Sequence, residues 1–436
     1  MNPIHRHAQS LPDVAGMVPP HRAAADDAGL ADAVPTAAAT RAQLIVHLVE
    51  SLASANSESG LLNLIRHLPA ERYRHAVVCL RDQGDYEAGL REQGVEILNL
   101  HQQDGSLAHY LRLYRVLRSL RPSLIETRNR GGLPAQLVAA LAGVRLRVHG
   151  EYGRELARHG RASLGERALL RLLRPLVDHF IVVSSDLQRW LVDAVGADPA
   201  RVTQIANAVD SVQFHPRLGP AAAVGPPGFM HDGAFVIGSI GPMDDSAGQV
   251  QLVDAFLRLI ASPHSAHQRL RLMLIGDGPA RAECQAMLNR AGAGARAWLP
   301  GARGDTAQLL RAMDLFVLPS LHEDRANLIL EAMASGLPVV ATAVGGNTEL
   351  VHPGFTGILV PPMAPELLAS AIADYCRIPE MAVRHGARAR SQVIARHSMP
   401  AMARDYLAVY DTLIDTLAQE EAGRAAEAGA GPERER

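Results

Sequence analysis

The sequence predicts an α/β protein with two doubly wound, Rossmann-like domains. Short apolar segments rich in β-branched residues alternate with segments of helical period along most of the chain, which is the pattern of βαβ units and parallel sheets. The chain has 436 residues and is 48% hydrophobic, which is enough for two domains with cores of their own.

The first predicted domain begins with a buried strand at 43–49. Further strands are expected at 76–80, 95–100, 123–127, 145–150, 180–185 and 202–205. The helices between them are expected at 61–67, 86–93, 107–120 and 134–142. This alternation predicts a parallel sheet with helices on both faces.

The second predicted domain repeats the pattern. Its strands are expected at 235–241, 272–275, 315–320 and 337–343, and the segment 354–362 follows them. Its helices are expected at 249–260, 305–313, 327–335 and over 364–395, and a last amphipathic helix at 402–417.

Composition sets the segment boundaries. Ala, Pro, His and Asp without periodicity predict disorder at the N-terminus, a Pro- and Ala-rich stretch predicts a linker, and a charged Ala/Gly-rich end predicts a disordered tail. The predicted segments are a disordered N-terminal segment (1–40), the first domain (41–216), a linker (217–227), the second domain (228–400), the last helix (401–417) and the tail (418–436).

The overall charge excludes some function classes. A net charge of −2 gives no basis for nucleic-acid binding, which needs a basic excess. Cys79, Cys284 and Cys376 are far apart and fit neither a disulfide pattern nor a metal site, so a reducing compartment is expected. No apolar run is long enough for a transmembrane helix, and the N-terminus lacks a signal peptide. All 43 basic residues are arginines.

The stretch 315–351 carries the candidate chemistry. It reads as strand, polar loop, helix, strand and a Gly345-Gly346 turn, where backbone can approach a ligand closely. Two carboxylates, Glu323 and Glu331, lie on its loop and helix. Carboxylates accept strong hydrogen bonds from hydroxyls, although acidic residues also favour a solvated helix start.

This stretch resembles the retaining GT-B glycosyltransferases of family 4, also called group 1. Glu323 and Glu331 hold the family's E-x7-E spacing, and ILEAMASGLPVVAT followed by GG-x-x-E-L-V is close to the family's wording. The resemblance spans about residues 43–415 and implies two domains facing a cleft. The segments HGEYGR, VTQIANAVD and GDGP further resemble the sugar transferases associated with exosortase/PEP-CTERM exopolysaccharide loci.

The resemblance implies roles for particular residues. Glu323 would face the donor sugar and Glu331 the nucleotide ribose, and His149 would lie near the reacting centre as the catalytic candidate. No metal or cofactor is expected, because the family stabilises the leaving diphosphate with cations and amides. The other donor-side candidates are Arg325, Asn327, Gly241, Gly276, Gly278, Gly345 and Gly346, and the acceptor-side loop candidates are Glu58 and Gly60.

Several phosphate-binding positions depart from the family pattern. The expected Arg and Lys after the first strand of the second domain are Pro242 and Ala247, and two acids, Asp244 and Asp245, enter beside them. Losing one charge-assisted contact costs about 1.5–3 kcal/mol. Only an arginine can compensate in a chain without lysine, and Arg325 and Arg303 are the candidates, although an ordinary solvated role fits Arg325 as well.

The first domain departs too. The family's glycine pair after the first strand falls on Ala55-Asn56, the usual N-G-V-D is Asn207-Ala-Val-Asp210, and the usual E-G is Glu323-Asp324. Side chains at positions suited to close backbone approach hinder contact with phosphates and acceptor.

Two functions therefore stay open. The first is a hexosyltransferase-type glycosyltransferase that moves a sugar from a nucleotide-sugar to an exopolysaccharide or lipid-linked glycan with retention. The second is a weakened or inactive relative that acts as a scaffold or regulator of polysaccharide assembly. A cytoplasmic location is expected for either. The basic amphipathic segment 161–177 fits peripheral contact with the inner face of the membrane, or an ordinary helix with solvated arginines.

Overall fold

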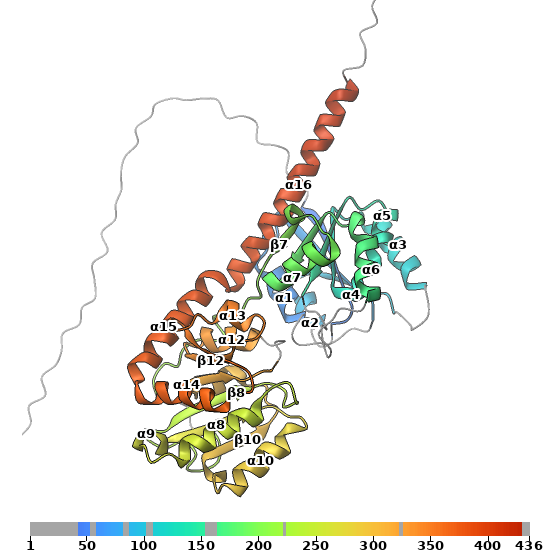
Figure 1. Cartoon of the computed structure of the whole chain (residues 1–436). Helices are drawn as coiled ribbons and strands as arrows, with labels where there is room; N and C mark the ends of the chain where they lie inside the picture. The colour runs from blue at the N-terminus through green and yellow to red at the C-terminus, as the bar shows by residue number, and fades with distance from the viewer. Residues whose placement is uncertain are drawn as a thin grey trace, which may run out of the picture. The chain divides into compact units, whose positions relative to one another are not determined.

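The computed structural model describes seven stretches of the chain. They are residues 42–52, 58–81, 87–101, 108–152, 164–220, 224–321 and 326–429. Within them the chain forms two parallel sheets of seven and six strands with helices around them, so the predicted pair of Rossmann-like domains is confirmed (Figure 1).

The first sheet is entirely parallel in the order β3-β2-β1-β4-β5-β6-β7. The chain builds outward from β1 in one direction and then from β4 in the other, so the topological switch point lies between these two strands. The strands are β1 (Gln43–Val49), β2 (Tyr73–Cys79), β3 (Glu96–Asn99), β4 (Leu124–Arg128), β5 (Leu146–Glu151), β6 (His179–Val182) and β7 (Val202–Gln204).

Helices connect these strands in right-handed βαβ fashion. They are α1 (Glu58–His67), α2 (Glu87–Glu92), α3 (Ala108–Leu120), α4 (Asn129–Gly132), α5 (Ala135–Leu141), α6 (Leu164–Leu173) and α7 (Ser185–Trp190), with the short turns η1 (Arg174–Leu176), η2 (Leu191–Val195) and η3 (Pro199–Arg201).

The second sheet is also parallel, in the order β10-β9-β8-β11-β12-β13, and its switch point lies between β8 and β11. Its strands are β8 (Phe235–Ile240), β9 (Leu270–Ile275), β10 (Ala297–Gly301), β11 (Leu315–Leu318), β12 (Val339–Thr342) and β13 (Gly357–Val360). Its helices are α8 (Gln249–Ala261), α9 (Ser265–Gln268), α10 (Ala280–Arg290), α11 (Thr306–Arg311), α12 (Ala326–Ala334), α13 (Asn347–Leu350), α14 (Pro365–Arg377) and α15 (Pro379–Arg396), with the turn η4 (Gly294–Arg296).

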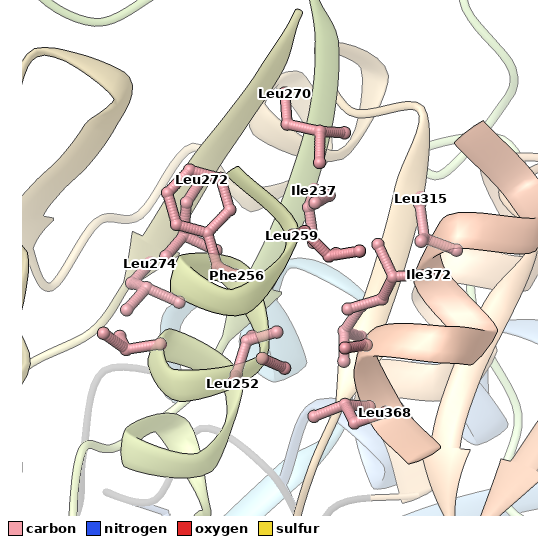
Figure 2. Close-up of a cluster of buried hydrophobic side chains, with 14 of the residues drawn as sticks. Ile237, Leu252, Phe256, Leu259, Leu270, Leu272, Leu274, Leu315, Leu368 and Ile372 are labelled. Carbon is pink, nitrogen blue, oxygen red and sulfur yellow. The ribbon is translucent and has the colours of Figure 1, made fainter. Parts of the chain in front are cut away.

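A dry core holds α8 and α14 against the second sheet. Figure 2 shows Leu252, Phe256 and Leu259 of α8 beside strand residues of β8 and β9. The three α8 residues recur at the spacing that places them on one helix face. Each is at most 5% exposed, so this face fixes where α8 begins, and with it the loop that follows β8.

The last helix, α16 (Met399–Gly429), packs on the first sheet. Met402, Tyr406 and Tyr410 are buried together with Ile45 and Leu124. Here the structure corrects the predicted tail at 418–436, because the helix continues through Gly429. The extension is rich in Ala and Glu, which are strong helix formers, and Arg424 pairs with Glu420 one turn away.

Candidate functional site

The second-domain candidates gather where the strands of the second sheet end. Gly241 follows β8, Gly276 and Gly278 follow β9, and the Gly345-Gly346 pair follows β12. In parallel sheets ligands bind at this carboxyl edge, beside the switch point. Glu323 and Arg325 belong to the loop after β11 and lie outside the described residues.

Gly276 and Gly278 allow two loops to pack closely against each other. Both have positive φ, 145° and 148°, and a Cβ on Gly276 would lie 1.8 Å from the carbonyl oxygen of Gly241. A Cβ on Gly278 would lie 2.4 Å from the carbonyl oxygen of Met243. These glycines therefore let the loop after β9 approach the loop after β8, a structural role that their sequence motif did not reveal.

Helix α12 presents two oxygen acceptors one turn apart. The buried Oδ1 of Asn327 has no hydrogen-bond partner among the described residues. Four residues later, no donor of the described part of the chain reaches the carboxylate of Glu331, and burial raises the pKa of this group to about 7. Residues at i and i+4 share a helix face. A ligand that donates hydroxyl protons is therefore the natural partner of both.

Three further acceptors at the same edge were not predicted. Within the described part of the chain, three buried side-chain oxygens have no hydrogen-bond partner, namely Oε1 of Gln249, Oδ1 of Asn347 and Oγ of Ser320. Gln249 begins α8, Asn347 begins α13, and Ser320 follows β11. Their positions at element boundaries were visible in the sequence, but their lack of partners was not. Unpaired buried polar atoms are uncommon and point to an absent partner.

Acidic residues surround the start of α8. Asp244, Asp245 and Glu283 line a cavity of about 230 Å³ there. Asp244 is held by hydrogen bonds of 3.0 and 2.6 Å from the backbone N–H and the hydroxyl of Ser246. Ala247, which stands where a lysine was expected, is 1% exposed. The electrostatics here oppose an anion.

Arg303, one of the two arginines considered as replacements for the missing cations, is occupied. Its guanidinium donates to both oxygens of Asp305 at 2.8 and 2.6 Å and stacks on Trp298. The neighbouring carboxylate raises the pKa of this arginine. A bidentate pair leaves little of its positive charge for a ligand.

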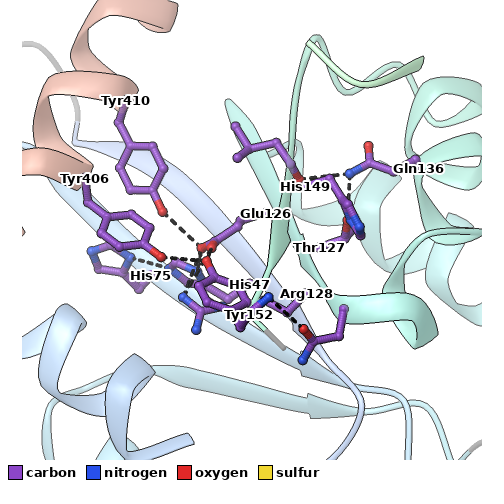
Figure 3. A network of polar contacts seen from close by, with 12 residues as sticks. His47, His75, Glu126, Thr127, Arg128, Gln136, His149, Tyr152, Tyr406 and Tyr410 are labelled. Carbon is purple, nitrogen blue, oxygen red and sulfur yellow. Dashed lines mark hydrogen bonds and ion pairs between the residues drawn. The ribbon is translucent and has the colours of Figure 1, made fainter. Parts of the chain in front are cut away.

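His149 lies at the end of β5 in a fully buried hydrogen-bond chain (Figure 3). Gln136 Nε2 donates to Thr127 Oγ1 at 2.7 Å and to the carbonyl oxygen of Val148 at 2.9 Å. Thr127 Oγ1 lies 2.8 Å from His149 Nδ1. Among the described residues, Nδ1 of His149 is the acceptor within reach of the threonine hydroxyl proton, so Thr127 donates this hydrogen bond to Nδ1.

This chain of donors fixes the tautomer of His149. Nδ1 accepts a hydrogen bond, so the neutral ring carries its hydrogen on Nε2. Nε2 is buried and has no hydrogen-bond partner among the described residues, and the carboxylate oxygen of Glu151 lies 3.7 Å from it. His149 is therefore arranged to donate a hydrogen bond to a ligand.

A second buried network joins β4 to α16 through Glu126 (Figure 3). His47 Nδ1 lies 2.7 Å and the Tyr410 hydroxyl 3.0 Å from Glu126 Oε2, and Tyr152 also donates to this carboxylate. Burial opposes the charge, but Arg128 and His47 hold the pKa of Glu126 well below its usual range. The partners are up to 284 residues apart, so no local pattern indicated them.

The first-domain loop candidates are only partly placed. Gly60 lies in the first turn of α1, with open space where a Cβ would stand. Glu58 begins the same helix, but its side chain is not described, and residues 53–57 lie outside the described part. The acceptor-side role of Glu58 and Gly60 therefore stays a prediction.

Two arginines of the segment 161–177, Arg171 and Arg174, make structural contacts. Arg171 Nε donates to the carbonyl oxygen of Ala194 at 3.0 Å, and Arg174 donates to Val195 at 3.1 Å and also to Gly196. These carbonyls close the end of η2. In the region 161–177, residues 161–163 are outside the described residues. Among the described residues of the whole chain, no helix has the length and apolarity needed to cross a membrane.

Two protein families match successive parts of the chain. Residues 57–213 match the family described as "Glycosyltransferase Family 4", and residues 234–377 match "Glycosyl transferases group 1". Each match covers most of one of the two sheets.

Similar curated proteins have related names. The D-inositol 3-phosphate glycosyltransferase of Kineococcus radiotolerans is 32% identical over 268 residues, which are 58% of this chain and 60% of that protein. An Escherichia coli UDP-Gal:alpha-D-GlcNAc-diphosphoundecaprenol alpha-1,3-galactosyltransferase is 26% identical over 258 residues, 57% of this chain and 65% of that protein. The chain thus spans somewhat less than two thirds of the length of these relatives.

Solved structures share the fold. A glycosyltransferase from Rickettsia africae superposes with a TM-score of 0.71 at 16% identity, covering 86% of this chain and 99% of that one. Anabaena Alr3699/HepE, solved in complex with UDP, gives a TM-score of 0.69 at 21% identity, covering 85% and 100%. Both likenesses concern the arrangement of the elements.

Proposed function

We propose that this chain is a hexosyltransferase-type glycosyltransferase. The premise is that it carries a glycosyltransferase family 4 domain followed by a group 1 glycosyl transferase domain. It would transfer a sugar from a nucleotide-sugar donor to a growing exopolysaccharide or lipid-linked glycan, of the kind made at PEP-CTERM loci, with retention of anomeric configuration. The protein would act in the cytoplasm, at the inner face of the membrane.

The pair of acceptors on α12 supports this proposal most directly. The Oδ1 of Asn327 and the carboxylate of Glu331 share one helix face and lack donors in the described part of the protein. A ribose or hexose offers adjacent hydroxyls that donate to such acceptors, and the hydrogen bonds would replace solvation that burial has removed. Glu323, which precedes α12 in the sequence, would contact the donor sugar.

The names of two similar proteins suggest which class of nucleotide-sugar donor to test first. The E. coli relative is named for a UDP-galactose donor and a diphosphoundecaprenol-linked acceptor, and the Anabaena structure contains UDP. We therefore propose a UDP-sugar as the first donor to test and a lipid-linked glycan as the first acceptor.

His149 would stabilise the donor rather than remove a proton. With Thr127 donating to Nδ1, the Nε2–H group of His149 is a hydrogen-bond donor. Such a group can bind a sugar hydroxyl near the reacting carbon, whereas it cannot accept a proton there. No general base is assigned, which agrees with a retaining reaction that the resemblance implies.

The leaving diphosphate would be stabilised by backbone amides and by Arg325. The first-turn amides of α8, a helix of 13 residues, face the loop that the resemblance assigns to phosphate binding. Arg303 is paired with Asp305, so Arg325 is the remaining candidate of the two arginines considered. We expect catalysis that is slower than in relatives with the Arg–Lys pair.

One observation favours the alternative function. Asp244, Asp245 and Glu283 line the cavity where the diphosphate would lie, and like charges at close range repel a diphosphate. If this repulsion prevents turnover, the protein would act as a scaffold or regulator in polysaccharide assembly.

Calorimetry separates the two functions at the binding step. UDP, GDP and their sugars are titrated into the purified full-length protein, with Glu331→Ala as the site variant and Glu92→Ala as an exposed control. The transferase proposal predicts micromolar binding that Glu331→Ala weakens at least tenfold. Absence of binding across the panel, from folded protein, would contradict it and favour the scaffold function.

A further inference from the structure

We propose that α3 and α5 form a binding face for anionic phospholipid, with a headgroup pocket at its end. The name "α3–α5 face" denotes the apolar residues Leu111, Tyr114, Leu137 and Leu141 together with Arg115, Arg118 and Arg121. These residues lie on two helices that contact each other on the first sheet.

The apolar side chains of this face are exposed. Leu111 is 65% exposed and Tyr114 38% on α3, and Leu137 is 46% exposed and Leu141 69% on α5. Single exposed leucines are ordinary, but two exposed apolar residues on each of two helices that contact each other are a feature of binding surfaces. The opposite sides of these helices are already packed, through Leu113 and Leu117 of α3 and Ala135 and Ala139 of α5.

The charge of this region is one-sided. Between residues 108 and 150 the sequence contains eight arginines and a single acidic residue, Glu126, although the whole chain has a net charge of −2. Glu126 is fully buried in its own network. Arg115, Arg118 and Arg121 are exposed, and no carboxylate in the described part of the chain pairs with them. An uncompensated basic surface attracts anionic lipid.

A cavity of about 450 Å³ lies where both helices end. Leu117 and Leu417 contribute apolar walls, and Arg118, Arg121 and Arg145 contribute guanidinium groups. One carboxylate, that of Glu421, pairs with Arg145. The exposed residues of α3 and α5 therefore lead into a pocket with an excess of positive charge.

This combination fits a lipid headgroup better than a soluble anion. The arginines can bind a headgroup phosphate, while the leucines and the tyrosine enter the acyl boundary beside it. The pocket lies at the amino ends of β4 and β5, whereas His149 lies at the carboxyl end of β5. It is therefore separate from the candidate active site.

The structure also moves the expected membrane contact along the chain. The segment 161–177 was the membrane candidate in the sequence, but Arg171 and Arg174 donate to backbone carbonyls of η2. On α3, Arg112 donates to the carbonyl oxygen of Leu100 at 3.0 Å, whereas Arg115 and Arg118 make no such bond within the described part of the chain. The inference rests on the proposed function in one respect: lipid binding would give the enzyme access to a lipid-linked acceptor. The test of lipid binding uses neither a donor nor sugar transfer, so it can fail independently of the proposed function.

Vesicle cosedimentation tests the proposal with the full-length protein. The vesicles consist of phosphatidylcholine alone or of phosphatidylcholine with phosphatidylglycerol. We expect binding to the anionic vesicles that falls at least tenfold in Arg115→Gln/Arg118→Gln/Arg121→Gln, because each arginine near an anionic surface contributes about 1 kcal/mol. Leu137→Gln/Leu141→Gln should also weaken binding, since these leucines would enter the acyl boundary.

Matched controls use exposed residues of the second sheet's helices. Arg290→Gln/Arg377→Gln/Arg384→Gln removes the same charge, and Leu367→Gln/Val383→Gln removes similar apolar surface. Both should bind vesicles as the unchanged protein does. Equal losses in test and control variants, equal binding to neutral vesicles, or displacement by millimolar inorganic phosphate would each overturn the proposal. Circular dichroism verifies that every variant is folded.

Discussion

The hydroxyl of Thr127 lies 2.8 Å from Nδ1 of His149 and donates a hydrogen bond to that nitrogen. Gln136 donates to the same hydroxyl oxygen, and Nδ1 is the acceptor that the described residues offer to the hydroxyl proton. His149 consequently carries its hydrogen on Nε2, the nitrogen that has no hydrogen-bond partner in the described part of the protein. One threonine thus decides what His149 can offer a ligand.

Replacing Thr127 should allow His149 to adopt either neutral tautomer. In Thr127→Val the side chain keeps its shape but loses the hydroxyl, so Nδ1 has no donor and the ring can place its hydrogen on either nitrogen. We expect a fall in kcat of about tenfold with a smaller change in KM.

Nitrogen-15 NMR of the histidine ring reports the tautomer directly, without donor or acceptor. Thr127→Ser keeps the hydroxyl and should restore both the Nε2–H signal and the rate. A Thr127→Val protein that keeps the Nε2–H tautomer would refute the positioning role.

Glu331 should make stability depend on pH. Its pKa is about 7 in the folded protein because of burial, compared with about 4.3 in an unfolded chain. The folded state therefore binds the proton more tightly, and this contribution to stability is lost as the pH rises from about 4.5 to 7. Glu331→Gln, which mimics the protonated form, should stabilise the protein by about 1–3 kcal/mol at pH 8 and by little at pH 4.

Urea unfolding at both pH values measures this difference. Glu92 is exposed, so Glu92→Gln is the matched control and should leave the free energy of unfolding unchanged at either pH. A Glu331→Gln protein that is no more stable than the unchanged protein at pH 8 would show that the carboxylate has a partner in solution.

Asp245 should weaken donor binding. It is exposed and lines the cavity at the start of α8, so its charge repels a diphosphate through partly screened solvent. Asp245→Asn should tighten the binding of a UDP-sugar about threefold at low ionic strength, and by less in high salt. Asp232→Asn, an exposed change before β8, provides the comparison. Unchanged affinity in Asp245→Asn would place the diphosphate elsewhere.

Glu126 should be the most sensitive point of the contact between α16 and the first sheet. Glu126→Gln would leave the buried guanidinium of Arg128 without its carboxylate partner, and such a loss costs about 3–5 kcal/mol. Tyr410→Phe removes one hydrogen bond to Glu126 and should cost about 1–2 kcal/mol.

Thermal unfolding of the two variants checks this ranking, with Tyr114→Phe as an exposed control of the same chemistry. If Glu126→Gln unfolded at the same temperature as the unchanged protein, the network would contribute nothing net to stability.

The strands were the most predictable part of the fold. β1, β8 and β11 are mostly apolar because each is buried in the middle of a parallel sheet. Helix α10 was not predicted, since its buried residues Ala280, Cys284 and Leu288 stand among charged ones and give a weak period. The predicted end of the last helix, at residue 417, was wrong for a different reason, because a charged composition fits both disorder and a solvated helix.

The candidate site was predictable where a motif spans one loop and its helix. The E-x7-E spacing pointed to Glu331, and the structure adds that its carboxylate lacks a donor. The side-chain oxygens of Gln249 and Asn347 stand out because they are buried without a hydrogen-bond donor in the described part of the chain. The spacing of residues in a sequence does not show whether a buried atom has a partner. The Thr127–His149 contact joins two adjacent strands, so it required the sheet register.

The central claim is that this protein transfers a sugar, and proton NMR of a bound nucleotide-sugar tests it most directly. The donor selected by calorimetry is incubated with the unchanged protein, with His149→Ala and with Glu331→Ala, with and without a lipid-linked acceptor. We predict release of the nucleoside diphosphate and a first-formed product that keeps the donor's anomeric configuration, with both variants slowed at least tenfold. A donor that binds yet stays intact in every sample would contradict the transferase account.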